Sequence, residues 1–551
     1  MEKFSGKELL QGEPDASSFP SGGLRTTYEA RGYTGWDPTS PPFIWEAGDG
    51  ITLCIPSIFF SWTGDVLDNK IPLLRSDTKI NEASLRLLKL TGTEATQVYS
   101  NLGWEQEYFI VDKKLYEKRP DLMIAGKTVI GAPSPKGQEL QDHYFGAVKD
   151  RVLSFMKDFE EEALKLAIPV KTRHNEVAPA QYEIAPIFEK ASISVDHNIL
   201  MMELMRRIAL KHGLVCLLHE KPYANLNGSG KHNNWSLATN KGLNLLDPTD
   251  YPEKSIQFLI LLTAVLSAVH RHEGLLRASI ASAGNDSRLG GHEAPPAIIS
   301  IYLGETLENL LNDIENETYS FKSHDKVTYE LGIPVIPDLT KDTTDRNRTS
   351  PLAFTGNKFE FRAVGSAASC ALPITILNAI VAESINTLCE AIEKNLDTTT
   401  APTSEQLALA ALPVVRDTLI ASKNIRFNGD NYSSSWLKEA RKRGLSNVSK
   451  AYHAFTALRD TKTIQAFKDI LTRPELESRY DIFVEQYSHH INIEAKLMIE
   501  LFHTFVLPAA FKHQKIVAKS IHATENAGIS KGALSKQKEY LSIISEGIET
   551  A

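Results

Sequence analysis

Two glutamates stand two residues apart in a stretch that favours a β-strand. The segment from Gly103 to Val111 reads GWEQEYFIV, and its aromatic and β-branched residues are typical of strands. Because side chains alternate between the two faces of a strand, Glu105 and Glu107 lie on one face, about 7 Å apart along the backbone. Two like charges on a half-buried face repel each other unless a cation or open water compensates them. The stretch therefore predicts either a cation site or an exposed edge strand.

The composition is that of a folded protein with no general affinity for polyanions. The chain has 551 residues, 42% of them hydrophobic and 23% charged, and this length predicts two to four domains. Its 60 Lys and Arg against 68 Asp and Glu give a net charge of -8, so we expect no nucleic-acid partner. A phosphorylated substrate would need a metal ion or a few local arginines.

Cysteine usage and hydropathy favour the cytoplasm. The four cysteines, Cys54, Cys216, Cys370 and Cys389, are far apart and form no CxxC motif, which predicts free thiols and no thiolate metal site. The first residues contain no apolar signal region, and the longest apolar run, 256–269, is too short to span a bilayer. We therefore expect a cytoplasmic protein without a membrane partner.

The order of the expected elements predicts a chain in three parts, with an α+β or α/β domain in the middle. Residues 1–78 are rich in Gly, Pro, Ser and aromatics and predict a small β-rich unit with a strand at 51–55. In residues 79–400, strands are expected at 104–111, 180–188, 214–218 and 358–364, and helices at 79–90, 144–167, 192–212, 254–270 and 305–316. Residues 401–551 are expected to be a helical region.

Helical spacing dominates the last part of the chain and begins shortly before it. Helices are expected at 380–393, 404–419, 462–471 and 479–505, with interruptions at Pro413, Pro474 and Pro508 and a loop at 424–435. These helices carry few clustered ionisable residues, so we interpret them as scaffold or assembly surface.

Two further segments supply carboxylates and a histidine. Glu176 and Glu183 are seven residues apart and would lie on opposite faces of a straight strand, but Pro179 between them predicts a bend that lets them converge. The segment NGSGKH at 227–232 lacks phosphate-loop spacing and is expected to let the backbone approach a small ligand. Surface charges around a turn and a structural histidine remain the alternatives.

Arginines follow in a loop and in a strand. A polar loop carries Arg288 and Glu293 and has the composition of a mobile flap. In the strand expected at 358–364, Lys358, Glu360 and Arg362 share one face. A salt-bridged edge strand is the alternative there, and such surface pairs contribute little to stability.

Together, the acidic residues and the histidine form a set that suits hard divalent cations. The set consists of Glu105, Glu107, Glu176, Glu183, His232 and Glu360. Oxygen donors with one imidazole favour Mg²⁺ or Mn²⁺ over zinc, and six ligands are enough for two ions. Two such ions beside arginines predict a phosphoryl-transfer centre.

The motifs, in this order, resemble those of glutamine synthetase. They are ExE at 105–107, NEVAPAQYE at 175–183, NGSGKH at 227–232, EAP at 293–295 and KFEFR at 358–362. GQELQDHYFG at 137–146 and HNNWS at 232–236 are similar to the type III branch. The resemblance implies an N-terminal β-grasp-like unit and a catalytic domain with a curved antiparallel sheet flanked by helices. It also implies a homo-oligomer of stacked rings, a dodecamer, with active sites between subunits.

The resemblance implies a role for each candidate residue. Glu107, Glu176 and Glu183 would hold one metal ion, and Glu105, His232 and Glu360 the other. Asn227, Gly228, Arg288 and Arg362 would bind the amino-acid substrate, and Arg348, Lys358 and Ser236 would bind ATP. Glu293 would close over the site together with Arg288, and Asp15 would reach the neighbouring subunit's site and help to deprotonate ammonium.

The implied reaction joins ammonia to glutamate in two steps. The γ-carboxylate of glutamate attacks the terminal phosphoryl group of ATP, and ammonia then displaces phosphate from γ-glutamyl phosphate. A related γ-glutamyl ligase that uses another amine, and a non-catalytic ligase-like assembly protein, are the rival hypotheses. Members of the family extend further at both ends, so we also expect the first part of the N-terminal unit to be missing.

Overall fold

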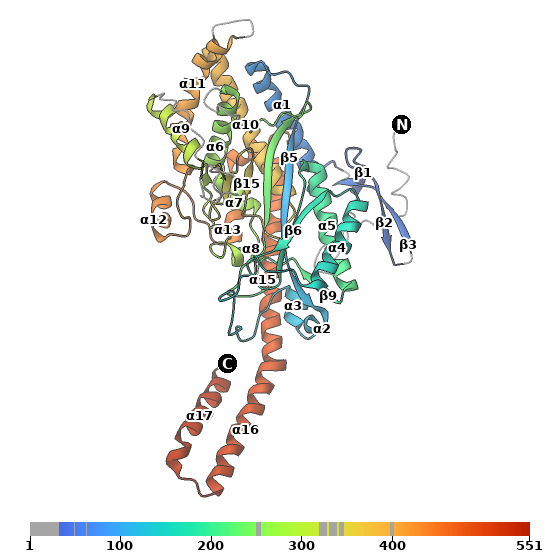
Figure 1. Ribbon diagram of the computed structural model, residues 1–551, viewed down its shortest axis with the longest axis vertical. Helices are drawn as coiled ribbons and strands as arrows, with labels where there is room; N and C mark the ends of the chain where they lie inside the picture. The colour runs from blue at the N-terminus through green and yellow to red at the C-terminus, as the bar shows by residue number, and fades with distance from the viewer. Residues whose placement is uncertain are drawn as a thin grey trace.

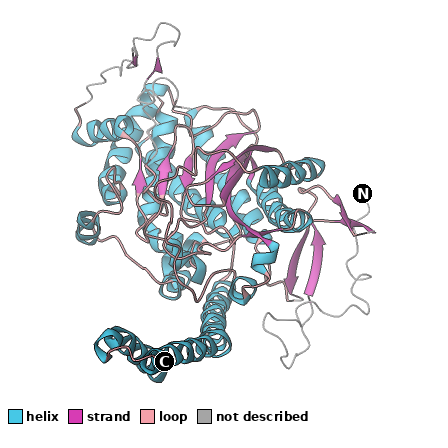
Figure 2. Ribbon diagram, turned by 60° about the horizontal axis from the view of Figure 1, so that its bottom comes forward, coloured by secondary structure: helices cyan, strands magenta, loops and turns pink. Residues whose placement is uncertain are grey.

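The computed structural model is an α+β molecule in which helices surround one large sheet (Figure 1). The structure describes residues 32–48, 50–61, 63–248, 255–318, 328–329, 339–340, 347–396 and 402–551. Asp15 lies outside these residues. Figure 2 shows the large sheet among the helices and the short N-terminal strands at the edge of the molecule.

The N-terminal part forms two separate pairs of antiparallel strands. β1 (Gly32–Trp36) pairs with β4 (Ser57–Ser61), and β2 (Phe43–Ala47) pairs with β3 (Gly50–Cys54). The strand expected at 51–55 is thus confirmed as β3. A β-grasp topology stays a prediction, because the described strands do not join into one sheet.

The large sheet has nine strands, in the order β11-β14-β15-β10-β5-β7-β6, with β8 and β9 also paired to β5. Their bounds are β5 (Val98–Asp112), β6 (Val170–Asn175), β7 (Gln181–Pro186), β8 (Glu189–Lys190), β9 (Leu214–Leu217), β10 (Lys231–Thr239), β11 (Ile301–Tyr302), β14 (Leu352–Phe354) and β15 (Phe359–Phe361). A further short pair, β12 (Thr328–Tyr329) and β13 (Leu339–Thr340), stands apart. The expectation of an antiparallel sheet needs a correction, because β11 and β14 run parallel and are joined by a long connection through a helix.

Helices cover one face of the central strand β5. α1 (Lys70–Thr91) and α5 (Ala191–Lys211) contact β5 directly, and α4 (Asp150–Lys165) packs on α5. Trp104 and Tyr108 are fully buried on this face, and Nε1 of Trp104 donates to the carbonyl of Ser194 in α5 at 3.0 Å. Since neighbouring side chains point to opposite faces, Glu105 and Glu107 point away from the helices.

The most apolar helix lies inside the molecule. α10 (Ala371–Asn395) is long and apolar enough to cross a membrane, but 78% of its most apolar window is buried. It packs against α1, α11 (Ser404–Ala421) and α6 (Ile256–Arg271). Its hydrophobic side chains therefore belong to the protein core.

Shorter helices connect these elements. They are α2 (Lys113–Tyr116), α3 (Pro120–Ala125), α7 (Glu273–Ser279), α8 (Ala283–Arg288), α9 (Glu305–Asn316), α12 (Ser434–Lys442), α13 (Ala451–Ala454) and α14 (Thr461–Ala466). The interruption expected at Pro413 is wrong, because this proline lies inside α11. Pro413 is exposed, while Ala411, Val415 and Leu419 bury the opposite face and hold the helix in place.

The C-terminal helices leave the body as a long hairpin (Figure 1). α15 (Arg473–Leu501) continues through a π-helical turn (Phe502–Val506) into α16 (Leu507–Asn526), and α17 (Ser535–Thr550) packs back against α16. α15 begins before the expected 479, because Thr472 and Glu475 form a capping box around Pro474. Pro508 does not interrupt the chain of helices as expected, because it lies in the first turn of α16, which directly follows the π-helical turn.

A buried polar network ties the first helix to the sheet. Asn378 of α10 donates to Asp77 of α1 at 2.9 Å and to Ser100 of β5 at 3.1 Å, and it accepts from Nε1 of Trp235 at 3.0 Å. Burial is the main cause that raises the pKa of Asp77 from 3.8 to about 6. The folded protein therefore favours the neutral carboxyl group.

We predict that Asp77→Asn stabilises the protein at pH 7.5 and by about half as much at pH 5. The stability contributed by a raised pKa is present below the unfolded value of 3.8 and is lost as the pH rises through about 6. An asparagine keeps the acceptor oxygen and does not ionise, and the shift corresponds to roughly 2 to 3 kcal/mol. Thermal unfolding of both proteins at the two pH values measures the difference. An equal Tm difference at both would contradict the assignment.

Candidate active site

The register of the sheet gathers the predicted acidic residues on its open face. In antiparallel pairs, side chains directly opposite each other lie on the same face. Glu105 lies opposite His232 of β10, and Glu107 lies opposite Glu183 of β7. Glu360 of β15 lies opposite Asn234, two residues beyond His232. The prediction that Glu105 and Glu107 share one face is confirmed, and this face is not an exposed edge because β5 is central.

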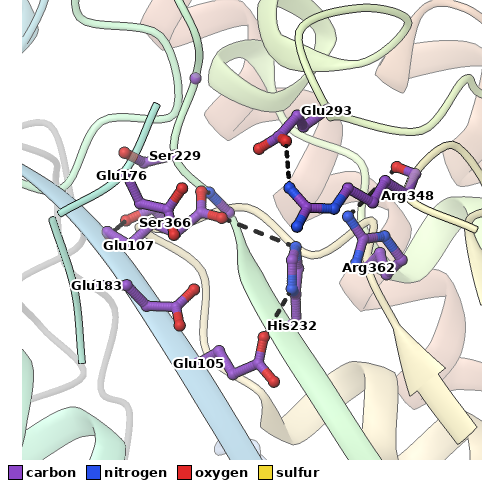
Figure 3. A network of polar contacts seen from close by, with 12 residues as sticks. Glu105, Glu107, Glu176, Glu183, Ser229, His232, Glu293, Arg348, Arg362 and Ser366 are labelled. Atoms are coloured by element: carbon purple, nitrogen blue, oxygen red, sulfur yellow. Dashed lines mark hydrogen bonds and ion pairs between the residues drawn. The ribbon is translucent and has the colours of Figure 1, made fainter. Parts of the chain in front are cut away.

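His232 forms the centre of the cluster (Figure 3). Its Nδ1 lies 2.8 Å from Oε2 of Glu105 and 3.2 Å from Oε1 of Glu360, and its Nε2 lies 3.8 Å from Oε1 of Glu107. Burial and Arg362 act to lower its pKa, but the hydrogen bonds to Glu105 and Glu360 outweigh them and raise the pKa to about 10. The imidazole thus lies at the contact point of three carboxylates.

A hairpin turn brings in the next two carboxylates. β6 ends at Asn175 and β7 begins at Gln181, so the chain reverses around Pro179, as its position predicts. Nε2 of His174 lies 3.2 Å from Oε1 of Glu176 and 3.6 Å from Oε1 of Glu183. Burial, followed by the charges of nearby glutamates, raises the pKa of Glu183 well above its usual value. The expected convergence of these two carboxylates is therefore present.

Two arginines border the acidic cluster on the side opposite to the hairpin (Figure 3). Nη1 of Arg362 lies 2.9 Å from Oε1 of Glu360, and both side chains are buried. Nη1 of Arg348 lies 3.0 Å from Oε1 of Glu293 in a more exposed position. Arg362 also donates to the carbonyl of Arg348 at 3.3 Å, which links the two segments. β15 lies between β14 and β10 in the sheet, so it is an internal strand. The alternative of a salt-bridged edge strand is therefore wrong.

These side chains line a pocket of about 280 Å³. It is lined by Glu105, Glu107, Tyr144, Thr172, His174, Glu176, Glu183, Ala185, His232, Glu293, Arg348 and Arg362. The carboxylates outnumber the two arginines, so the pocket has an excess of negative charge that a divalent cation would neutralise.

The donor atoms of the pocket also fit metal ions. One ligand atom from each of Glu105, Glu183 and His232 lies within 4.8 Å of the others, and the same holds for His174, Glu176 and Glu183. Carboxylate oxygens with one or two imidazoles are the donors that Mg²⁺ and Mn²⁺ accept in proteins. The residues present therefore fit hard divalent cations.

A second pocket of about 400 Å³ adjoins the first along the sheet. Glu105 and Ala185 line both pockets, and the second one also contains Ser236 and Lys358. Its apolar walls include Phe188, which is 63% exposed. Ser236 and Lys358 thus lie close to Glu105, but they do not line the acidic pocket itself.

Arg288 and the glycine-rich segment lie deeper than expected. Arg288 is buried and donates to the carbonyl of Arg362 at 3.1 Å, and a Cβ atom at Gly230 would lie 2.0 Å from its Nη2. Asn227 is buried, and its amide donates to Gln181 at 3.3 Å. Together with Gly228, these residues lie behind the pocket and are not part of its lining.

Three residues of the two pockets, His174, Tyr144 and Phe188, were not predicted from the sequence. His174 lies two residues before Glu176, and strand periodicity alone places them on one face. Tyr144 stacks edge-on against His174, with ring centroids 5.4 Å apart. Tyr144 lies in a loop. A loop has no regular side-chain period, so its sequence does not predict which residues Tyr144 contacts.

Comparisons with known proteins agree with the geometry. The chain matches the family descriptions "Glutamine synthetase type III N terminal" over residues 1–76, "Glutamine synthetase, catalytic domain" over 85–296 and "Glutamine synthetase C-terminal domain" over 410–525. It is 48% identical over 551 residues to "Type-3 glutamine synthetase" of Dictyostelium discoideum. The matched region covers all of this chain and 74% of the relative.

Other relatives give the same result. "Glutamine synthetase" of Bacteroides fragilis is 47% identical over 95% of this chain and 71% of its own length. A cryo-electron microscopy structure of Plasmodium falciparum glutamine synthetase shares the fold with a TM-score of 0.53 at 15% identity, over 89% of each chain. On this evidence the chain belongs to the type III glutamine synthetases, which are glutamate–ammonia ligases.

Proposed function

We propose that the open face of the large sheet is the catalytic centre, where two divalent ions, Mg²⁺ or Mn²⁺, hold ATP beside glutamate. The convergence of five glutamates and His232 on one face, next to Arg348 and Arg362, is the observation that carries this proposal. Glu107, Glu176 and Glu183 would hold one ion, and Glu105, His232 and Glu360 the other. When bound, such ions neutralise charge on the phosphoryl group that is transferred.

The adjoining pocket is proposed to take the nucleoside of ATP. Its position supports this, because a nucleotide placed there would extend its phosphates toward the acidic cluster. Lys358 and Ser236 offer polar contacts, while Phe188 offers an exposed ring for the base. Arg348, at the far side of the cluster, is in a position to bind the terminal phosphate.

Arg362 and Glu293 are proposed to act on the acyl group. Arg362 lines the pocket and has a fixed orientation because of its bond to Glu360, so it can hold a substrate carboxylate or the developing charge on its oxygen. Asn227, Gly228 and Arg288 support this position from behind and would reach the substrate after a local shift. Glu293, paired with Arg348, closes one side of the pocket against water.

The proposed reaction forms and breaks two bonds. An oxygen of the glutamate γ-carboxylate attacks the terminal phosphorus of ATP, and ADP leaves with the bonding electron pair. Ammonia then attacks the carbonyl carbon of γ-glutamyl phosphate, the C–O bond to phosphate breaks, and the attacking nitrogen loses a proton as phosphate leaves. Ammonium must first lose a proton to a carboxylate, for which we propose Asp15 of a neighbouring subunit together with Glu293.

Assembly into a ring oligomer, a dodecamer of stacked rings in the cytoplasm, completes the proposal. Exposed apolar side chains on β3, such as Ile51 and Leu53, support a role of the N-terminal unit in subunit contacts. The C-terminal hairpin exposes further apolar residues, including Phe505 and Phe511. We propose that the chain is divided into an N-terminal unit at 1–78, a catalytic domain at 79–400 and a helical region at 401–551.

We predict that Glu176→Gln weakens the binding of Mn²⁺ at least about tenfold and removes most ligase activity, because the amide keeps the shape of the side chain but loses its charge. Isothermal titration with MnCl₂ measures the affinity. Glu161→Gln, an exposed position on α4, is the matched control and should bind Mn²⁺ like the unmodified protein. Unchanged affinity in Glu176→Gln would remove this residue from the metal ligands.

Phe188→Ala should raise the KM for ATP about tenfold, since stacking of a base on an aromatic ring contributes about 1 to 3 kcal/mol. The kcat should change little, because the ring would bind ground state and transition state alike. Phe188→Tyr keeps the ring and serves as the control. Equal KM values in the alanine and tyrosine variants would place the base elsewhere.

Glu293→Gln should let water reach the acylphosphate, so that more ADP forms per glutamine than in the unmodified protein. Thermal stability should not change, because the pair with Arg348 is exposed and such pairs contribute about 0 to 1 kcal/mol. Parallel assays of ADP and glutamine give the ratio, with Glu305→Gln at the exposed start of α9 as the control. A ratio of one in both variants would argue against a shielding role.

A further inference from the structure

A second cavity lies behind the active site, where three of its segments meet. It has a volume of about 340 Å³ and shares no lining residue with the active-site pocket. Glu220 comes shortly before the glycine-rich segment, Ser282 caps the helix that carries Arg288, and Ala367 lies in the segment that follows β15 and begins with Arg362. The remaining wall includes Gln486 of α15. An occupant of this cavity would therefore contact the rear of three active-site segments at once.

Glu220 gives this cavity its charge. Its side chain is only 5% exposed, and its carboxylate accepts hydrogen bonds from the backbone N–H of Ala367 at 3.2 Å and from its own backbone N–H. Among the described residues, no cation lies within ion-pair distance of it, and Arg288 and Lys231 act on it only from further away. Burial raises the pKa of this carboxyl group above its usual value. A buried carboxylate on a cavity wall is stabilised by a cation inside that cavity.

The other walls combine apolar surface with polar side chains, among them His219 and His490. His219 accepts a hydrogen bond from the backbone N–H of Lys221 at 2.9 Å, and burial lowers its pKa to about 4, so its imidazole is uncharged near pH 7. Leu372, Phe455 and Phe483 supply apolar surface. A carboxylate together with this apolar surface suits a small organic ammonium ion with a short hydrocarbon body.

Glu220 also contacts the segments that surround the substrate. Its backbone carbonyl accepts the N–H of Ser229 at 2.8 Å, within the glycine-rich segment. A Cβ atom at Gly284 would lie 2.1 Å from its Oε2, and one at Gly365 would lie 2.5 Å from its Oε1. The carboxylate is thus packed against both neighbouring segments. A change in its position would displace the segments that carry Arg288 and Arg362.

We propose that this cavity binds a small organic ammonium ion through Glu220, and that its occupant alters the affinity of the enzyme for glutamate. The site is separate from the pocket in which ammonium reacts, so the proposal goes beyond the ligase function. The apolar lining favours an alkylammonium ion over free ammonium.

Titration of the full chain with n-butylammonium chloride tests the binding, in the presence of saturating ammonium chloride that occupies the substrate amine site. We expect saturable binding in the millimolar range, as for a ligand of about five heavy atoms. The neutral analogue 1-butanol should bind at least about tenfold more weakly. No saturation by n-butylammonium up to about 20 mM, roughly twenty times a Kd of about 1 mM, would overturn the proposal.

Two substitutions connect the binding to Glu220. Glu220→Gln should weaken n-butylammonium binding at least about tenfold, because it removes the charge that the cation pairs with. Gln486→Lys, at an exposed position on α15, should also abolish binding, because its own ammonium group can enter the cavity. Gln486→Met has a similar length without the charge and should bind like the unmodified protein. Unaltered binding in both Glu220→Gln and Gln486→Lys would overturn the proposal.

The coupling to glutamate has its own test. If the cavity and the substrate site are linked, n-butylammonium must change the affinity for glutamate by the same factor by which glutamate changes the affinity for n-butylammonium. We expect a change of at least about fivefold, in either direction, at the lower end of common coupling energies. Binding without any change in glutamate affinity would overturn the coupling. Ligase activity is measured on the same protein preparation. Active enzyme that does not bind n-butylammonium would contradict the cavity proposal and leave the ligase function intact.

Discussion

The structure depends on keeping several carboxylates together on one face of a buried sheet. Desolvation and mutual repulsion both oppose this arrangement, as the raised pKa of Glu183 indicates. The opposite face of the same strand compensates, because Trp104 and Tyr108 are completely buried against helices. Each large apolar side chain buried in this way contributes about 1.5 to 3 kcal/mol. The helices therefore hold in place an arrangement of charges that His232 and Arg362 offset only in part.

The site combines one rigid part and one part that can open. His232, Glu360 and Arg362 are buried and bonded to one another, and their positions are fixed by the register of three strands. Arg348 and Glu293 form an exposed pair at the edge of the pocket. Exposed pairs of this kind contribute little energy, so the edge can release a product without disturbing the buried part. This difference suits a reaction that must exclude water during one step and admit ligands in another.

Local physical rules predicted which residues of this site share a face, but not how deeply each side chain is buried. The two-residue period of a strand placed Glu105 beside Glu107, and the restriction that proline imposes placed the bend before Glu183; both effects act within a few residues. The burial of Arg288 depends on contacts with segments about sixty and seventy residues away in sequence, and no local pattern encodes these. The contact between Tyr144 and His174 was not predicted either, because Tyr144 lies in a loop far from His174 in sequence. Pro413 was misjudged because tertiary packing of its helix overrides a local propensity.

The C-terminal region supports the segments that carry the candidate active site. Asp286 of α8 accepts the backbone N–H of Ala451 at 2.8 Å and pairs with Arg277 at 3.0 Å, and Arg277 in turn donates to the carbonyl of Val448 at 2.8 Å. These contacts attach the helix that carries Arg288 to residues from the C-terminal region. α15 then closes the cavity behind the same helix. A displacement of α15 relative to the body therefore reaches the substrate through α8, without any contact between α15 and the substrate.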